Sequence, residues 1–207
     1  MATKDIFEAV LAMDMAGVAA KTQAELDSGT DVGAILEDGL IAAMDEVGVR
    51  FSSGDLFVPE MLMAAKVMQQ GLEVLKPHLS EGQSQSKGIV VIGTVKGDLH
   101  DIGKNLVAMM VEGAGFEVVD LGVDVDDETF VQTAAEKGAD AIALSALLTT
   151  TMPSMANTVN AVKEANIAAK IIIGGAPVTE SFSKEIGADG YSPDAAGAVR
   201  LIKEIIA

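Results

Sequence analysis

The stretch GIVVIGTVKGDLHDIG, residues 88–103, decides the fold, because a short apolar run rich in β-branched residues passes directly into a polar loop. An uninterrupted apolar run of this length is typical of a strand that is buried on both faces of a sheet. Similar runs follow along the chain: FEVVDLG at 116–122, AIALSAL at 141–147, KIIIGG at 170–175 and the weaker ADGYS at 188–192. Each is followed by a segment of helical character, which predicts βαβ units and a parallel sheet.

Five strands in this rhythm predict a flavodoxin-like (Rossmann-like) fold, in which a five-stranded parallel sheet carries helices on both faces. In open sheets of this kind, ligands bind outside the carboxyl ends of the strands. We therefore expect functional residues in the loops that begin near Thr94, Gly122, Ser145 and Gly174.

The first 80 residues follow a different pattern, with apolar residues at helical spacing and little β-branched clustering. Helices are expected at about residues 4–15 and 17–28, then after Asp31 as an N-cap, and from Pro59 as a first helical residue. Four helices predict a small bundle, so the fold class is a helical bundle followed by an α/β domain. Three apolar residues at helical spacing are expected in the bundle core: Met44, Val47 and Met68.

Between the two patterns, residues 81–88 are small and polar and have no periodicity, which is typical of a hydrated linker. The expected domains are therefore a helical bundle over residues 1–80 and an α/β domain over residues 89–207. The linker between them is the expected hinge.

Charge and composition argue against several classes of function. The chain has 31 acidic and 14 basic side chains, and its net charge of −17 repels nucleic acid and anionic membranes alike. Without cysteine it has neither disulfides nor thiolate metal ligands. The N-terminus lacks the pattern of a signal peptide, and no apolar run approaches the roughly 20 residues that a membrane span needs. We expect a cytoplasmic protein that binds neither nucleic acid nor membranes.

His100 and Asp98 lie in the loop after the first strand, at the edge where this fold binds ligands. An imidazole that binds a metal usually donates its other ring N–H to a carboxylate or carbonyl, which sets its tautomer. Asp98 is close enough in sequence to supply that carboxylate. A lone histidine is more often structural than a ligand, so this pair by itself leaves both interpretations open.

Two later strands bring hydroxyl groups and glycines to the same edge. Hydroxyl side chains follow the third strand: Ser145, Thr149, Thr150 and Thr151. They suit a ligand pocket, and they equally suit helix capping or loop hydrogen bonds. Gly174 and Gly175 end the fourth strand, where glycine permits either close approach of a ligand or a simple turn.

Together, the three loops resemble the signature of cobalamin-binding domains that hold the cofactor with a histidine on the cobalt: Asp-x-His-x-x-Gly, then Ser-x-Leu, then Gly-Gly. In this chain 41 residues separate Gly103 from Ser145, and 26 separate Leu147 from Gly174. The resemblance extends to GLIAAMDEVGVRFSSGDLFVPEMLMAAKVM at 39–68, which looks like the helical cap of cobalamin-dependent methionine synthase and of corrinoid proteins of anaerobic methyltransferase systems.

This resemblance implies a role for each matching residue. His100 is the axial cobalt ligand, Asp98 is hydrogen-bonded to it, and Thr151 stands where methionine synthase has a serine that completes the relay. In the cap, Phe51 and Val58 match the residues that shelter the upper face of the corrin, although Val58 departs from the usual leucine. The remaining expected cofactor-binding residues are Leu99, Asp101, Gly103, Ser145, Leu147, Thr149, Gly174, Gly175 and Glu37.

The resemblance also implies a cofactor and partners. The cofactor is cobalamin or a related corrinoid, as methylcobalamin and cob(I)alamin, with cobalt as its metal. A substrate-specific methyltransferase loads the methyl group and a second methyltransferase passes it to tetrahydrofolate or a thiol coenzyme, while a reductive activation protein is a further expected partner. The chain is then a methyl-carrying component that does not turn over alone.

Three alternatives are weighed against this interpretation. The small subunit of an adenosylcobalamin mutase shares the signature but generally pairs it with a substrate barrel, and residues 31–78 argue against that. A cobalamin-dependent regulator uses the same two modules but carries a DNA-binding segment, and no basic helix-turn-helix pattern occurs here. A metallohydrolase built on Asp98 and His100 is poor in ligands, because the other histidine, His78, is expected to be exposed at the end of the bundle.

Overall fold

A computed structural model of the chain describes residues 3–78 and 86–206. They form two compact units, which are described separately. The helical unit comprises Met1–Gln85 with Gly113–Gly115, and the α/β unit comprises Ser86–Glu112 with Phe116–Ala207. Most of the predicted linker at residues 81–88 lies outside the described residues, so the predicted domain limits stay predictions.

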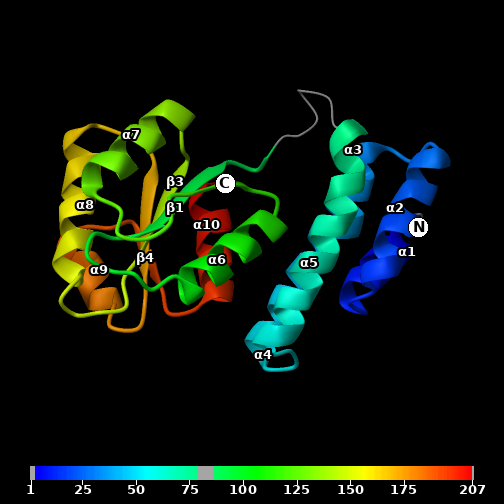
Figure 1. Ribbon diagram of the computed structural model, residues 1–207, viewed down its shortest axis with the longest axis horizontal. Helices are drawn as coiled ribbons and strands as arrows, with labels where there is room; N and C mark the ends of the chain where they lie inside the picture. Colours follow the sequence, from blue (N-terminus) through cyan, green and yellow to red (C-terminus); the bar gives the residue numbers. More distant parts are fainter. Residues whose placement is uncertain (1–2, 79–85, 207) are drawn as a thin grey trace. The chain divides into compact units, whose positions relative to one another are not determined.

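The helical unit is built from four helical rods (Figure 1). Two are α1 (Lys4–Leu11) and α2 (Met15–Asp27), and a third runs without a break through α3 (Val32–Ala34), the π-helical segment η1 (Ile35–Ile41) and α4 (Ala42–Ser53). The fourth is α5 (Val58–Leu75), which leads into the short 3-10 segment η2 (Lys76–His78). The predicted bundle of helices is thus confirmed, while the π-helical segment was not predicted.

The helix ends agree with the sequence pattern at one position and differ by one residue at another. The Asp31 side chain accepts a hydrogen bond from the Ala34 N–H at 2.9 Å, so the predicted N-cap is confirmed. Pro59 is the second residue of α5 and not the first, because α5 begins at Val58. The Glu60 carboxylate accepts the Phe57 N–H at 2.8 Å and fixes this earlier start.

The core of the helical unit is aliphatic. Met44, Val47 and Met68 are buried, as predicted. The other large buried side chains include Ile6, Val10, Val18, Ile35, Leu40, Met61 and Leu75. A Cβ atom on Gly71 would lie 2.7 Å from the Leu40 side chain, so glycine lets α5 approach the third rod closely at this point.

The α/β unit contains one five-stranded sheet in the order β2-β1-β3-β4-β5, and all four pairs are parallel. The strands are β1 (Ile89–Thr94), β2 (Glu117–Asp120), β3 (Ala141–Ser145), β4 (Lys170–Gly174) and β5 (Gly190–Ser192). The helices are α6 (Ile102–Gly113), α7 (Asp127–Lys137), α8 (Met152–Glu164), α9 (Glu180–Ile186) and α10 (Ala195–Ile206). This strand order is the flavodoxin-like order, and the predicted fold is confirmed.

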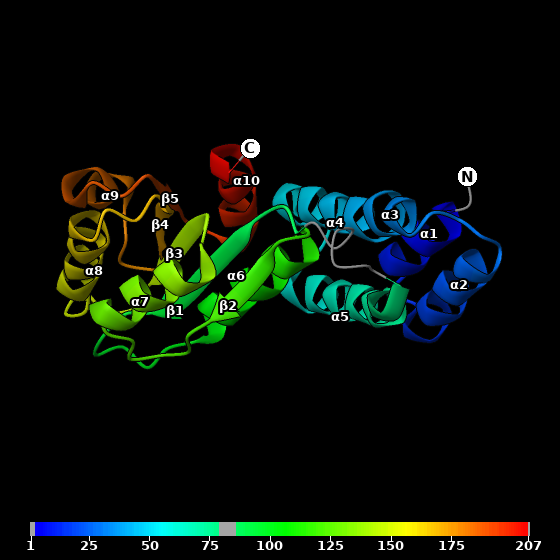
Figure 2. The same cartoon turned by 90° about the horizontal axis from the view of Figure 1, so that it is seen from above.

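Helices cover both faces of this sheet, with α7, α8 and α9 on one face and α6 and α10 on the other (Figures 1 and 2). Alternate strand residues such as Val91, Ile142 and Ile171 pack with Phe130 of α7 and Met155 of α8 in one buried cluster. Burial on both faces explains why the strands read as uninterrupted apolar runs.

The register of the sheet aligns the strand ends. Thr94 pairs with Ser145, Ser145 with Gly174 and Gly174 with Ser192, so four strands end on one line at the carboxyl edge. The loops that leave this edge carry the sequence motifs. No helix among the described residues is long and apolar enough to span a membrane.

Candidate functional site

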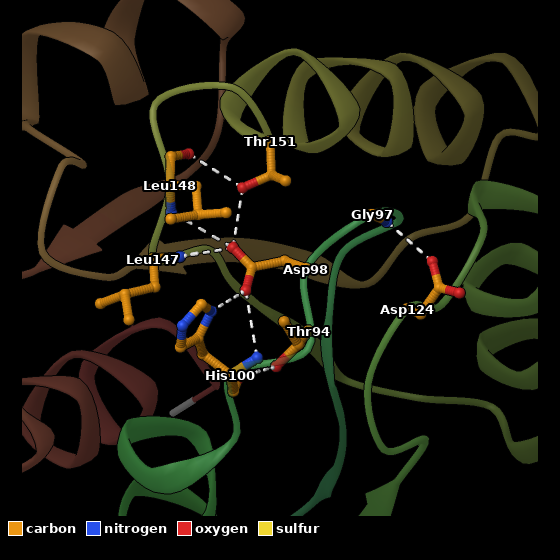
Figure 3. A network of polar contacts seen from close by, with 8 residues as sticks. All are labelled: Thr94, Gly97, Asp98, His100, Asp124, Leu147, Leu148 and Thr151. Carbon is orange, nitrogen blue, oxygen red and sulfur yellow. Dashed lines mark hydrogen bonds and ion pairs between the residues drawn. The ribbon is translucent and has the colours of Figure 1, made fainter.

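In the loop between β1 and α6, the side chains of Asp98 and His100 meet (Figure 3). The Asp98 N–H donates to the Val95 carbonyl at 3.1 Å, and Gly97 adopts a φ of 84° in the left-handed region that favours glycine. The buried Thr94 hydroxyl donates to the His100 carbonyl at 2.9 Å. A residue at the end of β1 therefore holds the backbone that carries His100.

Asp98 is a fully buried carboxylate with hydrogen bonds on both oxygens. Oδ2 accepts the N–H groups of Leu147 at 2.7 Å and Leu148 at 3.2 Å, and also the Thr151 hydroxyl at 2.7 Å. Oδ1 accepts the His100 backbone N–H at 3.1 Å and lies 2.7 Å from His100 Nδ1. The carboxylate thus joins the loop after β1 to the loop after β3.

These hydrogen bonds determine the charge of Asp98. Burial by itself would raise the pKa of this carboxyl group. The hydrogen bonds from the Leu147 N–H, the Thr151 hydroxyl and His100 outweigh burial and hold the pKa of Asp98 far below its ordinary value of 3.8. Asp98 is therefore a negative charge at neutral pH.

His100 shows one ring nitrogen to Asp98 and leaves the other open. Its side chain is 51% exposed, although its Nδ1 atom contacts a buried carboxylate. In the neutral imidazole, an Nδ1–H that donates to Asp98 leaves the lone pair on Nε2. This is the tautomer that a metal ligand requires, with the carboxylate behind the ring fixing its orientation.

Thr151 lies just before α8 and is buried beside Asp98. Its hydroxyl oxygen is 2.7 Å from Asp98 Oδ2 and 2.8 Å from the Leu148 carbonyl oxygen, and its single proton can go to one of these acceptors at a time. The threonine methyl group fits above Gly97, since even a Cβ atom added there would keep an ordinary 3.6 Å distance from it. The extra methyl group therefore does not displace the hydroxyl.

The glycines of the motif have different structural causes. At Gly103, an added Cβ atom would meet nothing within 4 Å, so open space lies beside the first turn of α6. At Gly175, which has a φ of 129°, a Cβ atom would lie 1.8 Å from the Ala146 carbonyl oxygen. At Gly174, it would lie 3.1 Å from the Ser192 carbonyl oxygen. The need for glycine at 175 thus comes from the protein's own backbone.

Exposed apolar side chains occur in both of the loops that meet at Asp98. Leu99 is 72% exposed and Ile102 is 86% exposed, and Leu147 and Leu148 of the third loop are also exposed. Exposed aliphatic side chains are ordinary when scattered, but here four lie in the two loops joined by Asp98. We name these four residues the apolar rim. Ile102 and Leu148 were not among the residues singled out from the sequence.

The other predicted site residues lie in several places. Asp101 is exposed, and its carboxylate accepts a hydrogen bond from the Asn105 side chain. Ser145 is half-buried at the end of β3, while Thr149 and Thr150 are exposed in the following loop. The fourth predicted hydroxyl residue, Thr151, contacts Asp98.

Three predicted residues belong to the helical unit. Glu37 is exposed in η1, Phe51 is half-buried in α4, and Val58 is exposed as the first residue of α5. Phe57, which precedes Val58, is 69% exposed and was not predicted. An aromatic residue at a helix N-cap, where serine, threonine, aspartate or asparagine is usual, is a signal that the sequence did contain.

Sequence reasoning also missed an ion pair between a buried lysine and a partly exposed aspartate. The Lys104 side chain is buried, and its Nζ atom donates to Asp120 at 2.6 and 2.7 Å and to the Asn105 side chain at 2.6 Å. Lys104 lies seven residues before the buried Val111 and thus on the same face of α6, a spacing that was readable. The pair ties the start of α6 to the end of β2.

Within residues 3–78 and 86–206, no group of three or more histidine, cysteine, aspartate or glutamate side chains is arranged to hold a metal ion. His78 is exposed at the end of the bundle, as predicted. The metallohydrolase alternative therefore lacks a ligand set in this part of the chain.

Comparison with known proteins adds independent findings. One family described as a B12 binding domain matches residues 88–200, and a second with the same description matches residues 2–76. Dimethylamine corrinoid protein 1 of Methanosarcina acetivorans is 47% identical over 190 residues, which cover 90% of this chain and 87% of that protein. Trimethylamine corrinoid protein 1 of Methanosarcina mazei is 46% identical over 191 residues, covering 90% of this chain and 88% of that protein.

A solved structure agrees over almost the whole chain. The methanol:cobalamin methyltransferase complex of Methanosarcina barkeri contains a chain that matches with a TM-score of 0.90 and 30% sequence identity. The match covers 99% of this chain and 79% of that one.

Proposed function

The chain belongs to the B12-binding corrinoid proteins, whose cofactor is cobalamin, and from this premise we propose that it carries methyl groups within a methyltransferase system. In this proposal, a substrate-specific methyltransferase loads the methyl group and a second methyltransferase removes it. The chain itself supplies the cofactor site.

One observation carries the proposal: the half-exposed His100 ring, with Nδ1 held by an ionised, buried Asp98 and Nε2 open. Cobalamin would bring most of the cobalt ligands itself, so the chain would need to add one further nitrogen donor, from His100. One imidazole with a fixed tautomer fits that need, whereas it would be a poor site for a bare metal ion. The donor set therefore fits cobalamin.

The surroundings of His100 fit the same cofactor. The apolar rim of Leu99, Ile102, Leu147 and Leu148 suits the flat, largely apolar face of a macrocycle. The open space at Gly103 suits a nucleotide tail that has been displaced from the metal. We propose that Ser145, Thr149, Gly174 and Gly175 line the path of that tail, and that Asp101 flanks it.

Cobalamin, when bound, supplies a cobalt centre that accepts a methyl group and gives it up again. The chain contributes the lone pair of His100 Nε2 and holds the ring through Asp98. Because its hydrogen bonds hold the pKa of Asp98 low, the carboxylate stays negatively charged at neutral pH and remains an acceptor for the His100 ring N–H. The Thr151 hydroxyl, 2.7 Å from Asp98 Oδ2, is a positioning partner of that carboxylate.

The helical unit has an exposed apolar end that suits a cover for the other side of the corrin. Phe51 and Val58 are the residues proposed to shelter it, with Glu37 as a polar contact, and the exposed Phe57 adds a large aromatic surface. Contacts of this kind exclude water without forming specific hydrogen bonds.

Relatives suggest the methyl donor. Proteins named for dimethylamine and trimethylamine are 47% and 46% identical to this chain, so we propose a methylamine as the donor. The matched chain in the methanol:cobalamin complex supports a methyltransferase as a direct partner. Tetrahydrofolate or a thiol coenzyme as acceptor, and a reductive activation protein, complete the proposed system.

The proposal is tested by His100→Ala in the full chain loaded with cobalamin, with His78→Ala as the matched control because these are the two histidines. We expect wild type and His78→Ala to show the absorption spectrum of histidine-ligated cobalamin. His100→Ala should show the spectrum without an axial nitrogen and bind cobalamin about 10- to 100-fold more weakly. An unchanged spectrum in His100→Ala contradicts the proposal.

The donor is tested separately by loading the chain with cobalamin, reducing it to the Co(I) form and adding, in parallel reactions, a methylamine methyltransferase or a methanol methyltransferase with its own substrate. Conversion to the methylated cofactor with dimethylamine or trimethylamine, and not with methanol, is the expected result. Methylation from methanol alone would contradict the proposed donor and leave the cofactor assignment intact.

A further inference from the structure

We propose that Asp124, in the loop between β2 and α7, is a positioning residue that sets the strength of the axial bond from His100. The inference rests on the proposed function of His100. Asp124 does not touch the imidazole; it holds the turn that carries Asp98 (Figure 3).

Asp124 holds this turn through two hydrogen bonds. Its Oδ1 atom accepts the Gly97 N–H at 2.7 Å, and its own N–H donates to the Asp98 carbonyl at 2.9 Å. The two bonds lie on either side of the Gly97–Asp98 junction. They fix the direction in which the Asp98 side chain leaves the backbone.

The loop that carries Asp124 is itself anchored to β1. The Thr94 N–H donates to the Gly122 carbonyl at 3.0 Å, and the Val125 N–H donates to the Thr94 carbonyl at 3.0 Å. Val95 and Val125 form an isolated parallel bridge. The loop that carries Asp124 is thus hydrogen-bonded to the end of β1. The turn after β1 is held both by Asp124 and by its internal hydrogen bond from the Asp98 N–H to the Val95 carbonyl.

The backbone conformation of Asp124 indicates that these two hydrogen bonds are specific. Its φ of 55° lies in the left-handed region, where residues other than glycine are uncommon and aspartate and asparagine are tolerated better than most. Without that conformation, the same residue would not present its N–H and its carboxylate to the same turn. Local strain of this kind persists where the surrounding contacts hold it.

Fold stability does not require the side-chain bond. Both Asp124 and Gly97 are exposed, so water can replace the carboxylate at the Gly97 N–H when the side chain is removed. Water at the Gly97 N–H would not, however, fix the position of the Gly97–Asp98 turn. We therefore expect loss of the Asp124 side chain to change the geometry of the site much more than the stability of the protein.

The consequence reaches His100 through Asp98. The Asp98 carboxylate sets the direction of the ring through the 2.7 Å contact with Nδ1, and an axial bond depends steeply on the approach of Nε2. Looser positioning of the Gly97–Asp98 junction loosens the ring and weakens its bond to the metal. Outer partners of metal ligands commonly change affinity by 10- to 100-fold, and for a residue one step further out we expect about tenfold or less.

Three variants of the full chain separate position from charge and strain. Asp124→Gly keeps the left-handed backbone and the N–H but removes the acceptor. Asp124→Asn keeps the left-handed preference and an acceptor oxygen but removes the charge. Asn166→Gly is the matched control, because Asn166 also has a φ of 55° and lies in the exposed turn after α8.

The first measurement uses protein loaded with cobalamin and reduced to the Co(II) form, in which a coordinated nitrogen splits the electron paramagnetic resonance signal. The expected ratio of histidine-on to histidine-off cofactor falls about three- to tenfold in Asp124→Gly. It stays at the wild-type value in Asp124→Asn and Asn166→Gly. Unfolding midpoints should be similar in all four proteins.

The second measurement needs no cofactor. In the cofactor-free protein, nuclear magnetic resonance of the histidine ring detects the His100 Nδ1–H that is hydrogen-bonded to Asp98, and His78→Ala assigns it. The exchange of this proton with water should be faster in Asp124→Gly and unchanged in Asp124→Asn.

Two results would overturn the inference: unchanged Nδ1–H exchange in Asp124→Gly, or equal losses in Asp124→Gly and Asp124→Asn, which would point to charge. Absence of nitrogen splitting in the wild type, combined with the expected exchange difference, would refute the proposed ligation by His100 and leave Asp124 as the residue that positions its ring.

Discussion

The two units treat buried polar groups in opposite ways. In the α/β unit, the buried Asp98 carboxylate receives hydrogen bonds from three loop residues and from His100. In the helical unit, the Thr22 hydroxyl is fully buried and has no hydrogen-bond partner among the described residues. A satisfied buried polar network specifies a unique geometry, whereas an unpartnered hydroxyl only costs stability.

This difference teaches what each unit contributes. The α/β unit orients a single imidazole through a chain of hydrogen bonds, and its function depends on angles and distances. The proposed functional residues of the helical unit include the apolar Phe51 and Val58, and we propose that its exposed apolar side chains act through contact area. Substitutions in the two units should therefore have effects that differ in size and in sign.

The largest expected effect comes from Asp98→Ala. It leaves the N–H groups of His100, Leu147 and Leu148 without their acceptor, so we expect the free energy of unfolding to fall by about 3–5 kcal/mol. Tyr191 in β5 is the one tyrosine and the chain has no tryptophan, so tyrosine fluorescence in a urea titration reports on the α/β unit.

Asp126→Ala is the control for Asp98→Ala. It removes an exposed carboxylate that caps α7 in the same unit and accepts hydrogen bonds from Thr129. Its loss of stability should be clearly smaller because water replaces the carboxylate. Equal losses would show that the Asp98 network contributes no special stability.

A smaller effect of the same network is expected in acid. The pKa of Asp98 is lowered in the folded state, so below its ordinary value of 3.8 the unfolded chain takes up a proton that the folded chain does not. The stability that Asp98 contributes is therefore present above about pH 4 and is lost as the pH falls toward the folded-state pKa.

This acid effect is measured on the cofactor-free protein as urea midpoints at pH 5, 4 and 3, again by tyrosine fluorescence. Asp98→Asn is the reference, because position 98 then has no carboxyl group to titrate. The urea midpoint of Asp98→Asn should fall less steeply with acid than the midpoint of the wild type. Parallel pH profiles would contradict the assigned charge of Asp98.

The smallest expected effect has the opposite sign. Thr22→Val replaces an unpartnered buried hydroxyl with a methyl group of similar shape, so the helical unit should gain about 1 kcal/mol. Thr158→Val is the same substitution in the α/β unit, where the buried hydroxyl donates to the Ser154 carbonyl at 3.0 Å, and it should lose stability. Amide hydrogen exchange in α2 and α8 measures both. Losses at both positions would remove the contrast between the units.

Much of the fold was readable from local pattern. The five strands appeared as uninterrupted apolar runs because the sheet is buried on both faces, and the parallel connections follow from helices of sufficient length between them. The line of Thr94, Ser145 and Gly174 at the carboxyl edge follows from that topology. Asp31 was recognisable as an N-cap because its chemistry is local.

Other features escaped local pattern. The π-helical segment η1 buries Ile35 and Leu40, which are five residues apart, within a stretch that also suits an α-helix. Pairing of Lys104 with Asp120, and of Asp124 with Gly97, joins residues from separate segments that no periodicity relates. These pairings depend on how closely two loops approach each other.

By itself, the sequence determined the order of elements, the edge where the motifs gather and the residue types available there. The family resemblance pointed to Thr151 as the partner of Asp98. Only the tertiary structure decided how the buried Asp98 charge is satisfied: Thr151 and the Leu147 and Leu148 N–H groups all reach one carboxylate oxygen, while Thr149 and Thr150 stay exposed. The physical reason is that spacing along the chain determines which residues follow a strand. Hydrogen bonds to both oxygens of a buried carboxylate form only when the loops that supply the donors are packed together.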